Sequence, residues 1–177
     1  MKSNLAQVMD WVFLHEGGYA ERDSEPGGAV NMGISFTAYK DWWTKNKKEG
    51  EPSFEDLKKL TREDAEGIYK DWFFTPVHFD TMPSGVDYAL IDLAVNSGVG
   101  GCLRAVSKQL RFPSVSKMTP QLSWALRFRD SVAIINAICD ARLALMKSSS
   151  KWTRFKDNWT RRVDKVRERA LHLARFG

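Results

Sequence analysis

The sequence has few of the residues that form metal sites or covalent cross-links. It contains two cysteines, Cys102 and Cys139, and three histidines among 177 residues. Both cysteines lie in apolar segments with a helical pattern, which favours buried free thiols over a disulfide. The histidines are scattered and lack the short paired spacings that zinc requires. We therefore expect no metal and no cofactor.

Long apolar runs are also missing. Asp10 interrupts the apolar stretch between Val8 and Leu14, and Glu16 follows directly. The amino terminus therefore does not have the form of a signal peptide. No segment approaches the roughly 18 consecutive apolar residues of a membrane span. We expect the chain to be made in the cytoplasm and to leave it by a route that the sequence does not encode.

Proline and glycine are sparse, with 6 and 12 residues, while 43% of the chain is hydrophobic and 28% is charged. This composition is typical of a folded globular protein. A chain of this length fits a single domain, 1–177, with a substantial core. The seven tryptophans suit such a core, and they also suit stacking of an indole face on a sugar ring.

Charge is distributed unevenly along the chain. Residues 1–100 contain 10 Lys and Arg against 17 Asp and Glu, whereas residues 101–177 contain 17 against 5. A basic half indicates an anionic partner, such as nucleic acid, a membrane surface or the acidic polymers of a bacterial envelope. The sequence has no zinc-finger spacing, basic heptad region or aromatic RNA-binding signature. We expect no nucleic acid as partner, although a nucleic-acid-binding protein is the second function class.

Hydrophobic periodicity predicts a mainly α protein. The expected helices cover 5–16, 37–47, 61–72, 84–97, 102–111, 120–147 and 152–173. The segment 19–35 differs, because turn-forming residues are too dense for a helix and leave room only for short extended pieces around 29–35. In the last helix, apolar residues recur every three or four positions and leave most cations on the other faces.

Glu16 is the first candidate for catalysis. It lies in the last turn of an amphipathic helix that Gly17 and Gly18 end. Apolar neighbours and the negative end of a helix dipole both favour a protonated acid, and glycines leave space for a bulky polymer. The alternative is an ordinary solvated glutamate before a glycine cap, and periodicity does not decide between them.

Further carboxylates follow in the glycine-rich segment, at Glu21, Asp23 and Glu25. If this segment folds back over the helix end, it brings a second acid close to Glu16. Two carboxyl groups in one cleft are what hydrolysis of a glycosidic bond requires.

These residues lie within a longer pattern that resembles glycoside hydrolase family 108, the N-acetylmuramidases of phage endolysins and some secretion-linked bacterial proteins. The matching segments are EGGY at 16–19, EPGGAVNMGIS at 25–35, AEGIYKDWF at 65–73, DLAVNSG at 92–98 and FKDNWTRRV at 155–163, together with Asp23 and Asp87. They span nearly the whole chain in the family's order.

The resemblance implies a lysozyme-like helical fold with a small glycine-rich loop or β region after the first helix. It implies a catalytic region, 1–95, followed by a basic helical region, 96–177, of peptidoglycan-binding type. The implied activity is cleavage of the β-1,4 bond between N-acetylmuramic acid and N-acetylglucosamine, with Glu16 as proton donor. We expect a monomeric phage endolysin that is made in the host cytoplasm and acts on the periplasmic wall after release.

Two positions depart from the family pattern. Glu25 stands where the family usually has Asp, and Val30 stands where it usually has Thr. A valine cannot hold the attacking water by a hydrogen bond. The base is therefore either Asp23 or Glu25, and inversion or retention stays open. A lytic transglycosylase of the same fold, or a non-catalytic wall-binding protein, is the alternative.

Three further residues are candidates for substrate binding. Tyr19 and Asn31 could bind sugar amides and hydroxyls, although packing explains Tyr19 and turn formation explains Asn31 equally well. Asn96 lies among apolar residues. It is either a buried amide with its hydrogen bonds made or part of the floor of the cleft.

Overall fold

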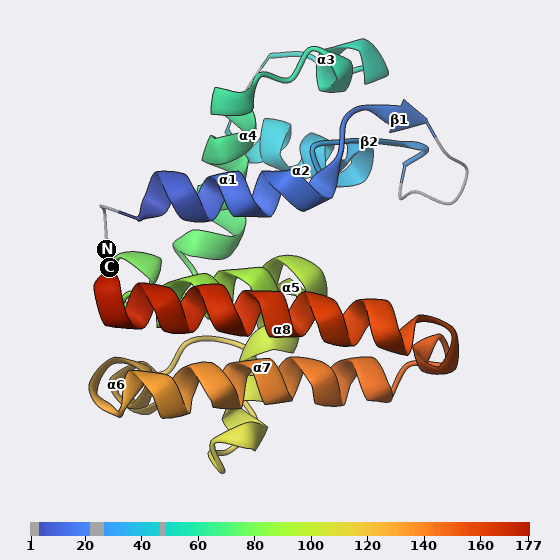
Figure 1. The fold of residues 1–177 in the computed structure, drawn as a ribbon. Coiled ribbons are helices and arrows are strands. Elements are labelled where there is room, and N and C mark those ends of the chain that lie inside the picture. Colours follow the sequence, from blue (N-terminus) through green and yellow to red (C-terminus); the bar gives the residue numbers. More distant parts are fainter. Residues whose placement is uncertain (1–3, 22–26, 47–48) are drawn as a thin grey trace. The chain divides into compact units, whose positions relative to one another are not determined.

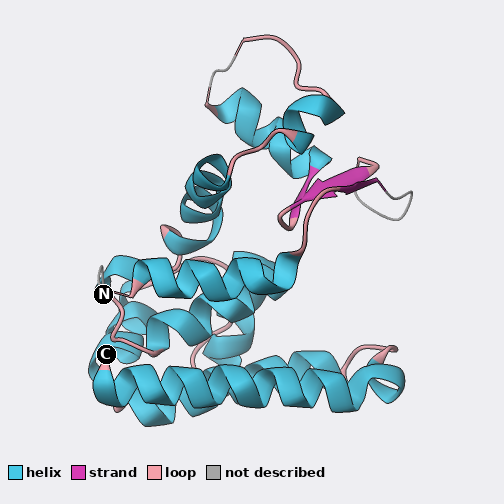
Figure 2. Ribbon diagram, turned by 45° about the horizontal axis from the view of Figure 1, so that its top comes forward, coloured by secondary structure: helices cyan, strands magenta, loops and turns pink. Residues whose placement is uncertain are grey.

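The computed structural model describes residues 4–21, 27–46 and 49–177, apart from the side chains of His15 and Glu16. These residues form eight α-helices and a three-stranded antiparallel sheet (Figures 1 and 2). The predicted mainly α, lysozyme-like class, with a small β region after the first helix, is confirmed.

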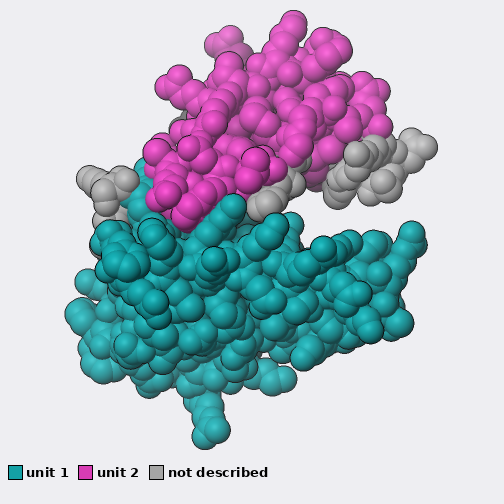
Figure 3. Space-filling model, in the orientation of Figure 1, with its two compact units in different colours: residues 1–5, 71–177 teal, residues 6–70 magenta. Residues whose placement is uncertain are grey.

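Two compact units make up the chain (Figure 3). The sheet-bearing unit is Ala6–Lys70, and the helical unit is Met1–Leu5 with Asp71–Gly177. The expected division into 1–95 and 96–177 by function stays a prediction.

The sheet-bearing unit begins with the first helix and continues into the sheet. Its elements are α1 (Leu5–Glu16), β1 (Ala20–Glu21), β2 (Ala29–Asn31), β3 (Ile34–Ser35), α2 (Phe36–Lys45), α3 (Phe54–Lys58) and α4 (Arg62–Tyr69). A two-residue turn joins β2 to β3, with Met32 and Gly33 both at positive φ (46° and 74°). This backbone matches the twist of the paired strands.

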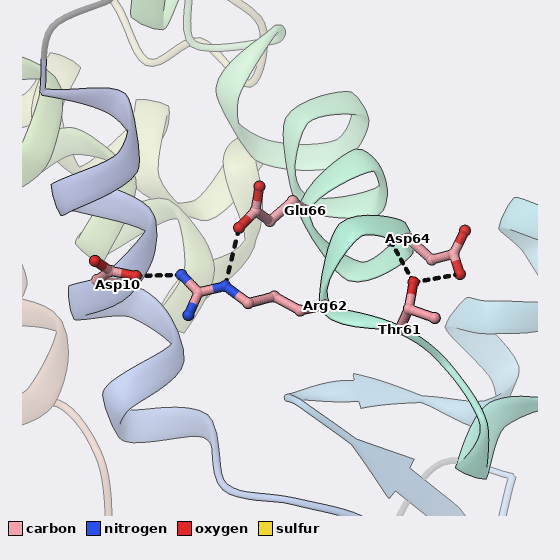
Figure 4. A network of polar contacts seen from close by, with 5 residues as sticks. All are labelled: Asp10, Thr61, Arg62, Asp64 and Glu66. Carbon is pink, nitrogen blue, oxygen red and sulfur yellow. Dashed lines mark hydrogen bonds and ion pairs between the residues drawn. The ribbon is translucent and has the colours of Figure 1, made fainter.

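Helix caps fix the beginnings of the two short helices. Sequence periodicity predicted a loop where α3 lies, but Ser53 and Asp56 form a reciprocal capping box that starts this five-residue helix. The predicted threonine cap is confirmed, since Thr61 Oγ1 accepts from the Asp64 backbone N–H at 3.1 Å. From the first turn of α4, Arg62 pairs with Asp10 of α1 and donates to Glu66 at 3.0 Å (Figure 4).

The helical unit contains a π-helical turn (Lys70–Phe74), a 3-10 turn (Phe79–Thr81), α5 (Val86–Gln109), α6 (Pro120–Phe128), α7 (Ser131–Lys147) and α8 (Trp152–Phe176). Helix α5 is central and contacts both α7 and α8. Its segment 86–94 is buried without a break, as predicted. At Gly98 the backbone leaves helical geometry (φ 69°, ψ 155°), which confirms the predicted interruption.

The single long helix expected at 120–147 is wrong, because α6 and α7 are separate. Asp130 starts α7, with its side chain accepting from the Ala133 N–H at 2.8 Å. The apolar period continues across the break and conceals it. An aspartate at this position satisfies a free N–H group of the new helix.

Close packing of α8 explains one glycine of the helical unit. Gly85 has φ 85°, and a Cβ at this position would overlap the carbonyl oxygen of Ala170. The thiols of Cys102 and Cys139 are free and buried, as predicted. Burial raises their pKa values to about 12 and about 11.

Contrary to the expectation from the sequence, α5 is long and apolar enough to cross a membrane by length and composition alone, with a mean hydropathy of 1.3 over its most apolar window. Half of that window is buried inside the protein. The buried side chains include Asp87 and Asp92. We interpret α5 as the core helix of its unit.

Candidate active site

Glu16 is the last residue of α1. The helix ends there because Gly17 takes the left-handed conformation (φ 70°), which is a common helix terminus. A Cβ built at Gly17 or Gly18 would meet no heavy atom within 4 Å. The predicted position of Glu16 at a glycine-ended helix with open space beside its backbone is therefore present, while its side chain lies outside the described residues.

The two candidates for the base, Asp23 and Glu25, also lie outside the described residues. The strands on either side of them are paired, with Ala20 opposite Val30 and Glu21 opposite Ala29. The chain therefore leaves and re-enters the sheet at one end. Only three residues separate this sheet from Glu16.

Tyr19 connects the helix end to the first strand. Its hydroxyl donates to Glu21 Oε1 at 2.7 Å, and Lys58 Nζ lies 5.6 Å from the centre of its ring. The hydrogen bond to Glu21, followed by burial, raises the pKa of Tyr19 to about 12. The phenol therefore stays protonated and polar beside an exposed carboxylate. This half-buried position is compatible with substrate contact and with packing.

Asn31 has a structural role that the sequence did not indicate. The residue is only 6% exposed in β2, and its Nδ2 donates to the carbonyl oxygens of Leu57 at 2.9 Å and Lys58 at 3.4 Å. Those carbonyls end α3 and have no partner within the helix. Asn31 thus ties the sheet to α3, whereas the sequence suggested turn formation or sugar binding.

Val30 is half-buried in the middle of β2, opposite Ala20 on one side and Ser35 on the other. Directly opposite residues of antiparallel strands project from the same face. The Ser35 hydroxyl accepts from the Ala38 N–H at 3.3 Å, which caps α2. Ser35 therefore supplies the hydroxyl beside the position where Val30 lacks one, and sequence reasoning missed it because the pairing sets this neighbour.

Asn96 belongs to the helical unit, while Glu16, Tyr19 and Asn31 belong to the sheet-bearing unit. Its side chain is exposed, which removes the interpretation as a buried amide. It donates to the Asp92 carbonyl at 2.7 Å and lines a cavity of its own unit. Over the described part of the chain, no three His, Cys, Asp or Glu side chains are grouped as metal ligands would be.

Comparison with known proteins agrees with the pattern in the sequence. A family model described as Glycosyl hydrolase 108 matches residues 9–98, which include α1 and the sheet. A solved structure titled "Structure of Brucella abortus SagA" is 34% identical, with a TM-score of 0.84 over 99% of this chain and 98% of that chain. No curated protein sequence matches the chain.

Proposed function

Because the chain belongs to glycosyl hydrolase family 108, we propose that it is a peptidoglycan N-acetylmuramidase, a lysozyme that cleaves the β-1,4 bond between N-acetylmuramic acid and N-acetylglucosamine. The observation that carries this proposal is the position of Glu16. It ends α1 inside the matched region, beside glycines that leave open space.

In the proposed reaction, Glu16 donates a proton to the glycosidic oxygen as the bond between this oxygen and C1 of the muramic acid breaks. The carbon develops positive charge, and a second carboxylate is needed to stabilise it or to activate water. Asp23 and Glu25 are both candidates. Water then supplies a hydroxyl to C1, and its remaining proton goes to the carboxylate that acts as base.

Val30 supports carrying a second candidate of the same fold. A lytic transglycosylase needs Glu16 alone, because the 6-hydroxyl of the muramic acid attacks C1 in place of water. The missing hydroxyl at residue 30 favours this reaction, whereas Ser35, which is paired with Val30, offers a replacement for holding water. A non-catalytic wall-binding or nucleic-acid-binding protein is the remaining alternative.

We further propose that the chain acts as a phage endolysin, made in the host cytoplasm and acting on the periplasmic wall after release. The basic half would contact the anionic bacterial envelope. Several cations of α8 are exposed, including Lys156, Arg161 and Lys165, so they are available for such contact. We expect the protein to act as a monomer.

Mass spectrometry of the muropeptides released from purified murein tests the proposal. A hydrolase leaves N-acetylmuramic acid at a reducing end. A 1,6-anhydro end would instead establish the transglycosylase. Intact murein, together with tight retention of the protein on DNA, would support the nucleic-acid-binding alternative.

A further inference from the structure

The helical unit contains a cavity of about 280 Å³ that the proposed chemistry of Glu16 does not use. It lies among α5, α7 and α8. Four of its lining side chains are apolar: Leu93, Leu145, Met146 and Trp159. Asn96, Ser97 and Ser149 add polar groups, and Arg142 is the lining residue that carries a charge.

Arg142 is buried, with 2% of its surface exposed, although it projects from an otherwise apolar helix. It forms an ion pair with Asp92 of α5, which is also buried. Arg162 of α8 lies 3.7 Å from the other oxygen of the same carboxylate. Two guanidinium groups therefore share one carboxylate, which leaves a surplus of one positive charge beside the cavity.

Donor groups of this cluster lack acceptors. Nε and Nη2 of Arg142 and Nε of Arg162 are buried and have no hydrogen-bond partner within the described residues. Buried polar groups in folded proteins nearly always have one, and a buried charge is costly when it is incompletely paired. Burial lowers the pKa of Arg142 to about 9, which keeps it protonated at neutral pH. The cluster is thus suited to an anion.

A carboxylate fits these features best. A planar guanidinium binds carboxylates in a two-pronged geometry, and a surplus of one charge matches a singly charged anion. The apolar walls suit the aliphatic part of a short ligand. Asn96 donates to the backbone of α5 through Nδ2, so its Oδ1 is available to accept from a peptide N–H.

We propose that this cavity, the carboxylate pocket, binds a carboxylate of the stem peptide of peptidoglycan. The inference rests on the proposed function, because that substrate carries short peptides with free carboxylates beside the bond that is cut. The pocket would hold the peptide part of the substrate on the helical unit, while Glu16 acts on the glycan.

Calorimetric titration of the full chain tests the inference with L-alanyl-γ-D-glutamyl-diaminopimelyl-D-alanine as probe. The same peptide with its carboxylates converted to amides is the matched ligand. Ser149→Asp places a negative charge in the pocket, and Ser149→Asn is its neutral counterpart. Ser149 Oγ accepts from the Lys151 N–H at 3.2 Å, and both replacements keep an acceptor, so folding should be preserved.

We expect the free peptide to bind, and the amidated peptide and Ser149→Asp each to weaken binding at least about tenfold, a loss of about 1.4 kcal/mol. Ser149→Asn should bind like the wild type. No binding of the free peptide, equal binding of the amide, or undiminished binding by Ser149→Asp would each overturn the inference. Digestion of purified murein by the same samples separates this result from failure of the proposed function, because hydrolysis without peptide binding sinks only the pocket.

Discussion

The side-chain amide of Asn31 donates to the carbonyl oxygen of Leu57 at 2.9 Å and so joins strand β2 to the end of α3. Replacement by alanine leaves a buried carbonyl without its partner, a loss of about 1–3 kcal/mol. We expect Asn31→Ala to lower the free energy of unfolding in urea by that amount, with little change in KM for glycan below the transition. Unchanged stability with a raised KM would instead assign Asn31 to substrate binding.

A buried carboxylate gives the helical unit a dependence on pH. Asp87 is completely buried and accepts from the backbone N–H groups of Gly85 and Tyr88 and from Asn4 Nδ2. Burial raises the pKa of Asp87 above its ordinary value, and these hydrogen bonds only partly oppose the shift. The folded protein therefore holds this proton more tightly than the unfolded chain does. Stability from this group is lost as pH rises from the ordinary aspartate pKa through the raised one.

Asp87→Asn removes this dependence. The buried Oδ1 of Asn4 has no hydrogen-bond partner within the described residues, so a rotated Asn4 amide can accept from the new side chain. Urea unfolding between pH 4 and 7 should show the variant gaining stability relative to the wild type as pH rises. The other carboxylates are common to both proteins, so parallel curves would contradict the assigned pKa shift.

Periodicity and caps were enough to predict most helices. The apolar positions expected in the last helix include Val163, Val166 and Ala170, and all three are buried. Helix α3 was missed because five residues are too few for an apolar period, and its capping box carries the signal.

The pairs that build the sites could not be predicted in the same way. Arg142 lies in an apolar helix where a charge is expected to face solvent, and its partner Asp92 is distant in the sequence. Ser35 became relevant only through the register that places it opposite Val30. Such relationships depend on tertiary pairing, which a single sequence does not specify.

The choice of base can be decided by comparing Asp23→Asn with Glu25→Gln. If one carboxylate activates the water, its amide variant should lose about 100-fold or more in kcat on purified murein, since general base catalysis is worth about that much. The other variant should stay close to wild type. Two mild effects would mean that neither residue is the sole base.

Attraction between the basic half and the envelope should weaken with salt, because exposed charges are screened over about 10 Å at 0.1 M. We expect the lysis rate of outer-membrane-permeabilised cells to fall as ionic strength rises. The double variant Lys156→Gln and Lys165→Gln, which removes two exposed cations of α8, should show a shallower fall. A wild-type rate that stays flat from low to moderate ionic strength contradicts this role.

The most direct test of the central claim compares wild type with Glu16→Gln on purified murein, with released muropeptides identified by mass spectrometry. The amide keeps the size of the side chain but cannot donate the proton. We predict reducing N-acetylmuramic acid ends from the wild type and at least about a hundredfold lower release from the variant, with unchanged thermal unfolding. A Glu16→Gln protein that folds normally and releases the same products at the wild-type rate would contradict the assignment of Glu16 as the catalytic acid.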